Sequence, residues 1–290
     1  MKVGIAFAGG GVRGAAHLGI LQAFEEHGIE ADMYAGTSAG SIVATMKALG
    51  HTNEECMDMM MAANKKLVDI AYWDIFKNMF TKFKNLESIL KGNKLRSYLM
   101  NHIGAKFLMN TKHGLGIIST DIDSGAQIIF TSEEIDKIAL STIDDILHVY
   151  GRYTPLSLPR IVYASCAVPG IFRPMRYNKR TLVDGSITNN LPANVLKAMG
   201  ADKVIAIDLS KRTPNVDDVH GIFNTLSQSI GIMVSQNTYL SLSYDKDVIK
   251  LNPDMSSIGL LDFDNVESCY EAGYNYGNQI ANFIKKELES

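Results

Sequence analysis

The first 50 residues contain two apolar runs, and each run is followed by a tight turn and then by a helical pattern. The first run covers residues 3–8, and a triple glycine separates it from an amphipathic stretch at 15–27. The second run covers residues 32–35, and the turn after it leads into an apolar stretch at 41–49. Strands that alternate with helices pair in parallel, because each helix carries the chain back across the sheet. The sequence therefore predicts an α/β fold with a mainly parallel sheet and helices on both faces.

The rest of the chain predicts one domain with a helical insertion. Residues 52–112 interrupt the alternation with a helical stretch rich in Met, Phe and Lys, which we interpret as a cap. The α/β pattern then resumes, with expected strands at 115–120, 127–130, 173–177, 181–183, 204–209 and 248–251 and expected helices at 222–242 and 265–286. No internal repeat or Pro/Gly-rich linker divides the sequence, so we expect a single domain over residues 1–290.

Composition and charge disfavour several classes of protein. The 46% hydrophobic and 20% charged residues are ordinary for a soluble globular chain, and a net charge of -3 gives no overall attraction to nucleic acid. The three cysteines form no C-x-x-C pair, so neither a disulfide framework nor a zinc site is indicated. We also expect no other metal and no cofactor. The N-terminal apolar run ends at the triple glycine, too early for a signal peptide, and no run is long enough to span a membrane. We therefore expect a cytoplasmic protein.

The turn after the second apolar run indicates a reactive serine. Residues 36–40 read GTSAG, which fits the G-x-S-x-G pattern with Ser38 between Gly36 and Gly40. In that motif the serine stands on a sharp turn between a strand and a helix, which exposes its hydroxyl for attack. A serine hydroxyl is a weak nucleophile, however, and needs a base to take its proton.

Two residues compete for the role of that base. Asp184 follows an apolar strand in LVDGS, from which a loop at the edge of the sheet can point it toward Ser38. Taken alone, the Asp184-Gly185 pair also fits a tight hairpin turn. His220 is the histidine that lies late enough for the order serine, acid, histidine of an α/β-hydrolase. Such enzymes place several strands before the nucleophile, whereas Ser38 follows a single βα unit, so we favour Asp184.

The triple glycine indicates a site for a negatively charged oxygen. Gly9, Gly10 and Gly11 follow the first strand and open the first helix, and amides without neighbouring Cβ atoms can converge on an oxyanion. The same loop formally matches the G-x-G-x-x-G pattern of dinucleotide-binding proteins. In those proteins an acidic residue follows the second strand, whereas here Asp32 precedes the second apolar run. We therefore favour the oxyanion hole, which also accounts for the serine turn.

Four motifs occur in an order and at spacings that resemble one known family. They are GGGVRGAAHLGILQAFEE at 9–26, GTSAGSIVA at 36–44, ASCAVPGIFRP at 164–174 and DGSITNNLP at 184–192. Weaker matches, STDIDSG at 119–125 and GLLDFDN at 259–265, extend the likeness over nearly the whole chain. The sequence thus resembles the patatin-like phospholipases of the bacterial type.

That resemblance implies a serine–aspartate dyad with no histidine, on a three-layer fold with a mainly parallel central sheet. By carry-over, Ser38 is the nucleophile and Asp184 is the base that hydrogen-bonds to it. The oxyanion hole would consist of Gly9, Gly10 and Gly11, with Arg13 supporting their loop. The motif glycines are Gly36, Gly40 and Gly185. Two positions depart from the family pattern: Ala8 stands where plant members have an acidic residue, and Ser186 where Gly or Ala is usual.

The implied activity is hydrolysis of fatty-acyl ester bonds of phospholipids or lysophospholipids through an acyl-enzyme on Ser38. A carboxylate is a poor base in water, but partial desolvation beside an apolar acyl pocket would raise the pKa of Asp184. An acyltransferase or a thioesterase could use the same dyad, and the sequence does not choose between them. Nor does it give the oligomeric state.

A basic segment suggests peripheral contact with a membrane. Residues 74–96 contain six basic residues and only Asp74 and Glu87 as acids, with phenylalanines interleaved among lysines. A helix of this kind suits an anionic lipid surface. It equally suits a packed cap helix whose lysines extend their charged ends into water. No larger basic field supports nucleic-acid binding. We lean toward the lipid-facing interpretation.

Overall fold

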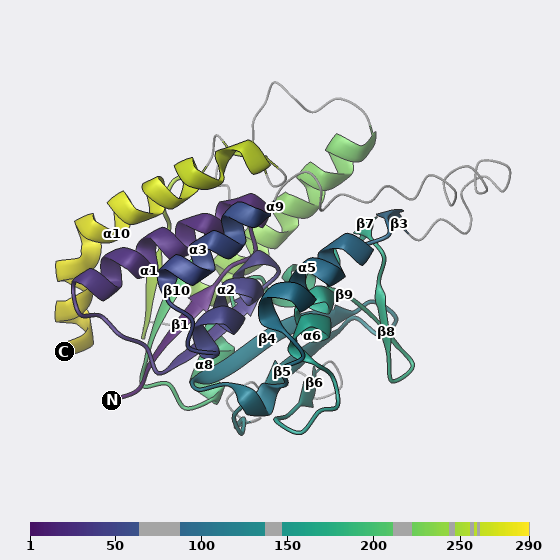
Figure 1. Cartoon of the computed structure of the whole chain (residues 1–290), viewed down its shortest axis with the longest axis horizontal. Helices are drawn as coiled ribbons and strands as arrows, with labels where there is room; N and C mark the ends of the chain where they lie inside the picture. Colours follow the sequence, from purple (N-terminus) through teal and green to yellow (C-terminus); the bar gives the residue numbers. More distant parts are fainter. Residues whose placement is uncertain are drawn as a thin grey trace, which may run out of the picture.

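The computed structural model describes residues 1–63, 88–136, 147–210, 222–243, 247–255, 258–259 and 262–289. Its central strands are β1 (Val3–Phe7), β2 (Met33–Thr37), β4 (Gly114–Asp121), β5 (Ala126–Thr131), β6 (Leu147–Tyr150), β8 (Met175–Tyr177), β9 (Arg180–Asp184), β10 (Lys203–Ile207) and β11 (Val248–Leu251). They form a sheet in the order β11-β10-β1-β2-β4-β5-β6, and the hairpin of β8 and β9 joins it alongside β4 (Figure 1).

Most neighbouring strands in this sheet run parallel. Strands β11, β10, β1, β2 and β4 are parallel to one another, as are β5 and β6. Antiparallel pairing is found between β4 and β5, β4 and β9, and β8 and β9. Every residue of β1 and β2 is buried, as expected for parallel strands that are covered on both faces. The predicted α/β class with a mainly parallel sheet is confirmed.

Helices form the two outer layers. They are α1 (Ala15–Glu26), α2 (Ala39–Ala48), α3 (Asn53–Ala62), α5 (Asn93–Ile103), α6 (Leu158–Ser165), α7 (Ser186–Asn189), α8 (Ala193–Ala198), α9 (Ile222–Ser243) and α10 (Val266–Glu289). Side chains of successive residues in a strand point to opposite faces, and β1 shows this directly. Ile5 and Phe7 join the core beneath α1, α2 and α10, whereas Ala6 joins the core beneath α8.

The first helix is locked in place by a close contact with the last one. A Cβ atom at Gly19 of α1 would collide with the Tyr270 carbonyl of α10, and one at Gly273 would collide with the Ala16 carbonyl. The two backbones can approach because these positions carry no side chain. Figure 1 shows α1 and α10 lying side by side along one face of the sheet. This contact fixes the helix that begins at the glycine-rich loop.

The expected hairpins form as the sequence predicts, but several elements between them were not predicted. The turn between β4 and β5 uses Gly125 at φ 74°, and its N–H donates to the Asp121 carbonyl. The elements that were not predicted are helix α6, strand β6 and the small parallel pair of β3 (Ser88–Leu90) with β7 (Gly170–Phe172). None of the helices in the described ranges is both apolar and long enough to cross a bilayer.

Within the expected insertion at 52–112, two helices belong to the layer that covers the sheet. Helix α3 packs against α1, and α5 packs against α6, with Met59 and Leu99 buried in the main core. Residues 64–87 lie outside the described ranges. The cap at 52–112 and the single domain over 1–290 therefore stay predictions.

Candidate active site

The glycine-rich loop and the serine turn meet at one edge of the sheet because they follow neighbouring parallel strands. In the register of β1 with β2, Phe7 lies opposite Gly36, so the residues after each strand leave the sheet together. A Cβ atom at Gly9 would lie 3.2 Å from the Cβ of Ser38. This is the carboxyl-terminal edge of the strands, where open α/β sheets bind their ligands.

Ser38 occupies a strained backbone conformation between β2 and α2. Its φ is 53° and its ψ is -126°, values that a residue with a side chain adopts rarely and mostly at functional sites. The two motif glycines make the turn possible, since a Cβ at Gly36 would collide with the Gly40 carbonyl and one at Gly40 with the Phe7 carbonyl. The Ser41 hydroxyl donates a 2.6 Å hydrogen bond to the Ser38 carbonyl and closes the turn.

Asp184 reaches the same place from the opposite direction. Strand β4 pairs first with β2 and then, further along the same edge, with β9. The last residue of β2, Thr37, lies opposite Ile118, and the last residue of β9, Asp184, lies opposite Ser119. The two strands therefore end head to head on one side of β4, and the residues at their ends come together. This pairing brings Ser38 and Asp184 to one site although they are far apart in the sequence.

The carboxyl group of Asp184 is buried and only half satisfied. The side chain is 1% exposed, and its Oδ1 accepts a 2.8 Å hydrogen bond from the Ser186 amide. Its Oδ2 makes no hydrogen bond of standard geometry with any described residue. Burial raises the pKa of Asp184, and hydrogen bonding from Ser186 and from the nearby Ser38 hydroxyl opposes that rise. A carboxylate with a raised pKa is a stronger base than a free one.

The chain after Asp184 turns into a helix rather than a hairpin. Gly185 is followed directly by α7, so the alternative of a tight hairpin turn at Asp184-Gly185 is wrong. A Cβ at Gly185 would collide with the Ile118 carbonyl of β4, which explains the glycine. Ser186, where the family pattern has Gly or Ala, begins the helix and supplies the amide that binds the carboxyl group.

The last residue of α6 and the segment just after it hold both residues of the expected dyad. The Ser38 amide donates to Ser165 Oγ at 2.9 Å, and the Asp184 amide donates to the Ala167 carbonyl at 2.9 Å. Between them, Cys166 places its Sγ 4.0 Å from the Ser41 hydroxyl. Burial raises the pKa of the Cys166 thiol, as does the charge of Asp184, so the thiol stays neutral. Ser165 lies in the family motif ASCAVPGIFRP, but nothing in the sequence indicates this role.

Arg13 fixes the orientation of the glycine-rich loop. Its backbone amide donates to the Gly10 carbonyl at 3.2 Å, and its side chain binds the same carbonyl through Nε and the Leu209 carbonyl through Nη1. Burial lowers the pKa of the Arg13 guanidinium, but arginine remains charged in proteins. The N–H of a trans peptide points away from its C=O, so the Gly11 amide points away from Arg13. The Gly10 and Gly11 amides donate to no acceptor among the described residues.

The Gly9 amide differs from the other two because it already has a partner. It donates to Asn190 Oδ1 at 3.1 Å and to the Asn190 carbonyl at 3.3 Å. Asn190 is buried, and its Nδ2 donates to Thr238 Oγ1 and Ser210 Oγ. Of the three amides expected in an oxyanion hole, only those of Gly10 and Gly11 are therefore available in this conformation. The role of Asn190 was not anticipated, although it lies within DGSITNNLP.

A buried histidine supports the loop from below. His17 Nε2 donates to the Ala8 carbonyl at 2.9 Å, since a carbonyl can only accept. Burial lowers the pKa of His17 to about 4, so the ring is neutral at physiological pH. Its contact with the Ala8 carbonyl turns the Gly9 amide toward Asn190.

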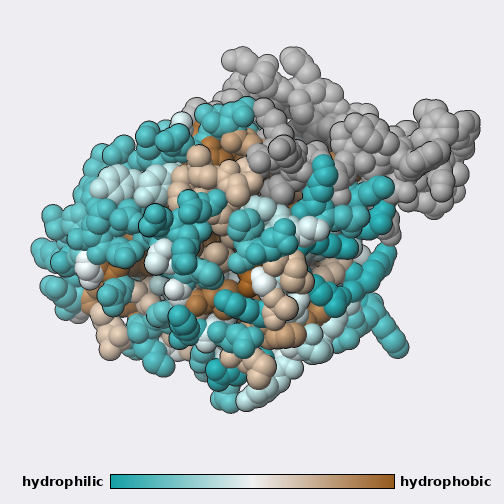
Figure 2. Space-filling view, in the orientation of Figure 1, coloured by the Kyte–Doolittle hydropathy of each residue, from teal (hydrophilic) through white to brown (hydrophobic). Residues whose placement is uncertain are grey.

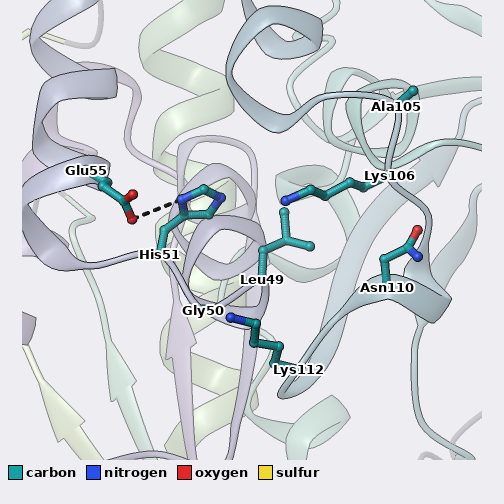
Figure 3. A pocket seen from close by; sticks show the side chains of 8 residues that line it. All are labelled: Leu49, Gly50, His51, Glu55, Ala105, Lys106, Asn110 and Lys112. Atoms are coloured by element: carbon teal, nitrogen blue, oxygen red, sulfur yellow. Dashed lines mark hydrogen bonds and ion pairs between the residues drawn. The ribbon is translucent and has the colours of Figure 1, made fainter.

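The pocket drawn in Figure 3 lies away from these residues, at the opposite end of α2 from Ser38. Its volume is about 470 Å³, and Lys106 and Lys112 face a hydrogen-bonded pair of His51 and Glu55 across it. It contains none of the residues that the sequence singled out. Within the described ranges, no group of three or more His, Cys, Asp or Glu side chains is arranged to hold a metal ion.

Two sequence-based hypotheses fall outside the part of the chain that the structure describes. His220, the alternative base, lies in the undescribed range 211–221. Most of the basic segment 74–96 lies in the undescribed range 64–87. Both hypotheses stay predictions.

The fold and the site together define a class of protein: a three-layer α/β chain with a serine elbow, a glycine-rich loop beside it and a buried aspartate opposite. The family model described as patatin-like phospholipase matches residues 5–197. The chain belongs to this family.

Relatives and a solved structure extend the comparison. An uncharacterized NTE family protein of Mycobacterium tuberculosis is 27% identical over 297 residues, covering 94% of this chain and 45% of the relative. The lysophospholipase NTE1 of Saccharomyces cerevisiae is 24% identical over 298 residues, covering 95% of this chain and 16% of the yeast protein. The chain thus spans less than half the length of these two relatives. The crystal structure of VipD from Legionella pneumophila matches with a TM-score of 0.49 and 15% identity, covering 97% of this chain and 66% of VipD.

Proposed function

We propose that this protein is a lipid acyl hydrolase that cleaves fatty-acyl ester bonds of phospholipids or lysophospholipids. The observation that carries the proposal is the head-to-head ending of β2 and β9 on β4, which brings Ser38 beside a buried, half-satisfied Asp184. Membership of the patatin-like phospholipase family supports the class of reaction, and the name of the yeast relative supports the class of substrate.

The first half of the proposed reaction forms an acyl-enzyme. Asp184 Oδ2 takes the proton of the Ser38 hydroxyl while Ser38 Oγ attacks the ester carbonyl. Because the carboxyl group is buried, its pKa is raised, and it accepts the proton more readily than an exposed aspartate. The negative charge that develops on the carbonyl oxygen is stabilised by the Gly10 and Gly11 amides. Proton transfer from Asp184 to the leaving alcohol then releases a lysophospholipid from a phospholipid, or a glycerophosphodiester from a lysophospholipid.

The second half returns the enzyme to its starting state. Asp184, again ionised, takes a proton from a water molecule that attacks the acyl carbonyl on Ser38. The tetrahedral intermediate collapses, Ser38 recovers its proton from Asp184, and the fatty acid leaves. An alcohol or a thiol in place of water would make the same dyad an acyltransferase.

We also propose peripheral contact with a membrane, because the substrates of this class reside in lipid surfaces. The sequence assigned this contact to the basic segment 74–96.

Two measurements test the proposed function. A fluorophosphonate mimics the tetrahedral intermediate and should label Ser38 in the wild-type protein, as shown by peptide mapping. Product analysis with phospholipids, lysophospholipids, neutral glycerides and acyl-CoA should show free fatty acid from the first two. A label on another residue, or hydrolysis of acyl-CoA alone, would overturn the proposal.

A further inference from the structure

Helix α9 exposes an apolar stripe that no described residue covers. Leu226, Ile230 and Met233 are 55%, 45% and 64% exposed and recur at a spacing that places them on one side of the helix. Ile232, Tyr239 and Leu240 are exposed as well. Exposed apolar surface that gathers on one element marks a site of interaction rather than ordinary surface variation.

The rest of α9 is polar but uncharged. Although 20% of the residues of the whole chain are charged, none of the 22 residues of α9 is. Its polar side carries Ser, Thr, Asn and Gln, whose transfer out of water costs far less than that of charged groups. A solvated surface helix normally carries charges opposite its apolar face. This helix is therefore suited to a partner that is itself apolar.

Among the described residues, α9 is anchored in the body of the protein near its C-terminal end, beside the candidate active site. Thr238 is buried and accepts a hydrogen bond from Asn190 Nδ2, and Asn190 in turn holds the Gly9 amide. Leu242 is buried in the core beneath α8. From this anchor the helix runs outward past the N-terminal end of α10, as Figure 1 shows. The apolar stripe thus leads away from the glycine-rich loop.

We propose that α9 docks this protein on a phospholipid bilayer, with the stripe of Leu226, Ile230 and Met233 inserted at the boundary between headgroups and acyl chains. The inference rests on the proposed function, which requires access to a lipid that resides in such a surface. The connection of α9 to the glycine-rich loop favours a bilayer over another partner. The bilayer that contains the substrate then contacts the exposed stripe of α9, and the glycine-rich loop lies near the opposite end of the same helix.

The absence of charge on α9 gives this mode of binding a signature. Attraction between basic residues and anionic lipid fades as salt screens it, whereas insertion of apolar side chains does not. Binding through α9 is therefore insensitive to salt and does not require anionic lipid. Binding through the basic segment 74–96 would show the opposite behaviour.

The test compares two triple variants of the full chain. In the first, Leu226→Gln, Ile230→Gln and Met233→Gln remove the stripe. In the matched control, Met100→Gln, Ile122→Gln and Phe283→Gln remove comparably exposed apolar side chains from α5, the β4–β5 turn and α10. Flotation with phosphatidylcholine vesicles is measured at low and high salt. The stripe variant should lose about tenfold or more in vesicle affinity at both salt concentrations, and the control should bind like wild type.

Three outcomes would overturn the docking proposal: equal binding by the stripe variant and wild type, equal losses in the two variants, or binding that depends on anionic lipid and vanishes with salt. If light scattering shows that the stripe variant converts a wild-type dimer to a monomer while vesicle binding is unchanged, a second copy covers the stripe instead. Hydrolysis of a water-soluble short-chain ester, measured on the same samples, reports separately on the proposed catalysis. Its absence in wild type would count against the proposed function alone.

Discussion

Two aspartates end up buried within a few residues of each other along β4 and β9, and they face opposite electrostatic surroundings. Asp121, at the end of β4, accepts hydrogen bonds from Ser124 Oγ, Arg180 Nη1 and the Asp123 and Thr181 amides. Burial acts to raise the pKa of Asp121, but these partners outweigh it and the pKa is lowered. Asp184 has one amide partner, and its pKa is raised.

The difference in hydrogen-bond partners and pKa indicates a structural role for the Asp121 carboxylate and a role in proton transfer for Asp184. Asp121 is ionised, fully satisfied and occupied in tying the β4–β5 turn to β9, which accounts for the STDIDSG match without any reactive role. Asp184 Oδ2 is buried and has no hydrogen bond of standard geometry with any residue in the described ranges, which costs stability and leaves that oxygen available for a proton.

The largest effect is expected on catalysis. Ser38→Ala and Asp184→Asn should each lower kcat for a short p-nitrophenyl ester by a factor of about 10⁴ or more, because the nucleophile and its base act as a unit. Asp121→Asn should retain most of the activity. Retained activity in Asp184→Asn, or equal losses in the two aspartate variants, would show that the contrast has no catalytic meaning.

The next effect is on stability, and its sign differs between the two aspartates. The pKa of Asp121 is lower in the folded than in the unfolded protein. Its carboxylate therefore contributes to stability at any pH above the unfolded pKa, and this contribution is lost as the pH falls through the folded pKa. Asp121→Asn should therefore cost about 1–3 kcal/mol at pH 7. The pKa of Asp184 is higher in the folded than in the unfolded protein, so ionisation of this carboxyl group reduces stability at any pH above its unfolded pKa. Asp184→Asn should melt at or above the wild-type temperature at pH 7, and a marked loss would contradict the account.

A smaller effect is expected from the residue that holds the Ser38 amide. Ser165→Ala removes this acceptor and should lower kcat about tenfold, with KM little changed, because the strained serine loses its orientation. Ser132→Ala is the matched control, since Ser132 is also buried and its Oγ accepts the Leu115 amide at 2.8 Å, far from the dyad. Comparable stability losses with unequal kcat would identify Ser165 as a positioning residue. Equal kcat values in the two variants would assign it a purely structural role.

The smallest effect is expected at the alternative base. His220→Ala should leave kcat/KM within about twofold of wild type, because the buried aspartate needs no histidine to accept the proton. Steady-state kinetics on the short-chain ester measures this directly. An inactive His220→Ala protein that remains folded would point to a triad in place of the dyad.

Local patterns in the sequence predict the class of fold and the serine turn, whereas Asp184 is assigned as the base through the resemblance to a family. Apolar runs and turn glycines mark β1, β2 and the hairpins, and a strained turn such as that of Ser38 requires small neighbours that the sequence displays. The contacts that hold the site are not local. Ser165 and Asn190 are ordinary polar residues in sequence, and their roles arise only when α6 and the segment before α8 pack beside the ends of β1, β2 and β9.

The glycine-rich loop also depends on contacts that the sequence does not reveal. Three glycines in a row suggest three equivalent amides, yet Asn190 takes the first of them and Arg13 binds the carbonyl of the second residue. Which amides remain available depends on hydrogen bonds from residues far away in the chain. The exposed face of α9 is also a property of the fold, since its apolar residues would suit a buried helix equally well.

In the proposed reaction Asp184, and no histidine, activates Ser38. The most direct test is the rate at which a fluorophosphonate labels Ser38, followed as a function of pH in wild type and in Asp184→Asn. In wild type the rate should fall as the pH drops through the raised pKa of Asp184, because the protonated carboxyl group cannot accept the serine proton. In Asp184→Asn labelling should be slower by orders of magnitude and should lose this pH dependence. Labelling of Asp184→Asn at the wild-type rate with the same pH profile would contradict the account.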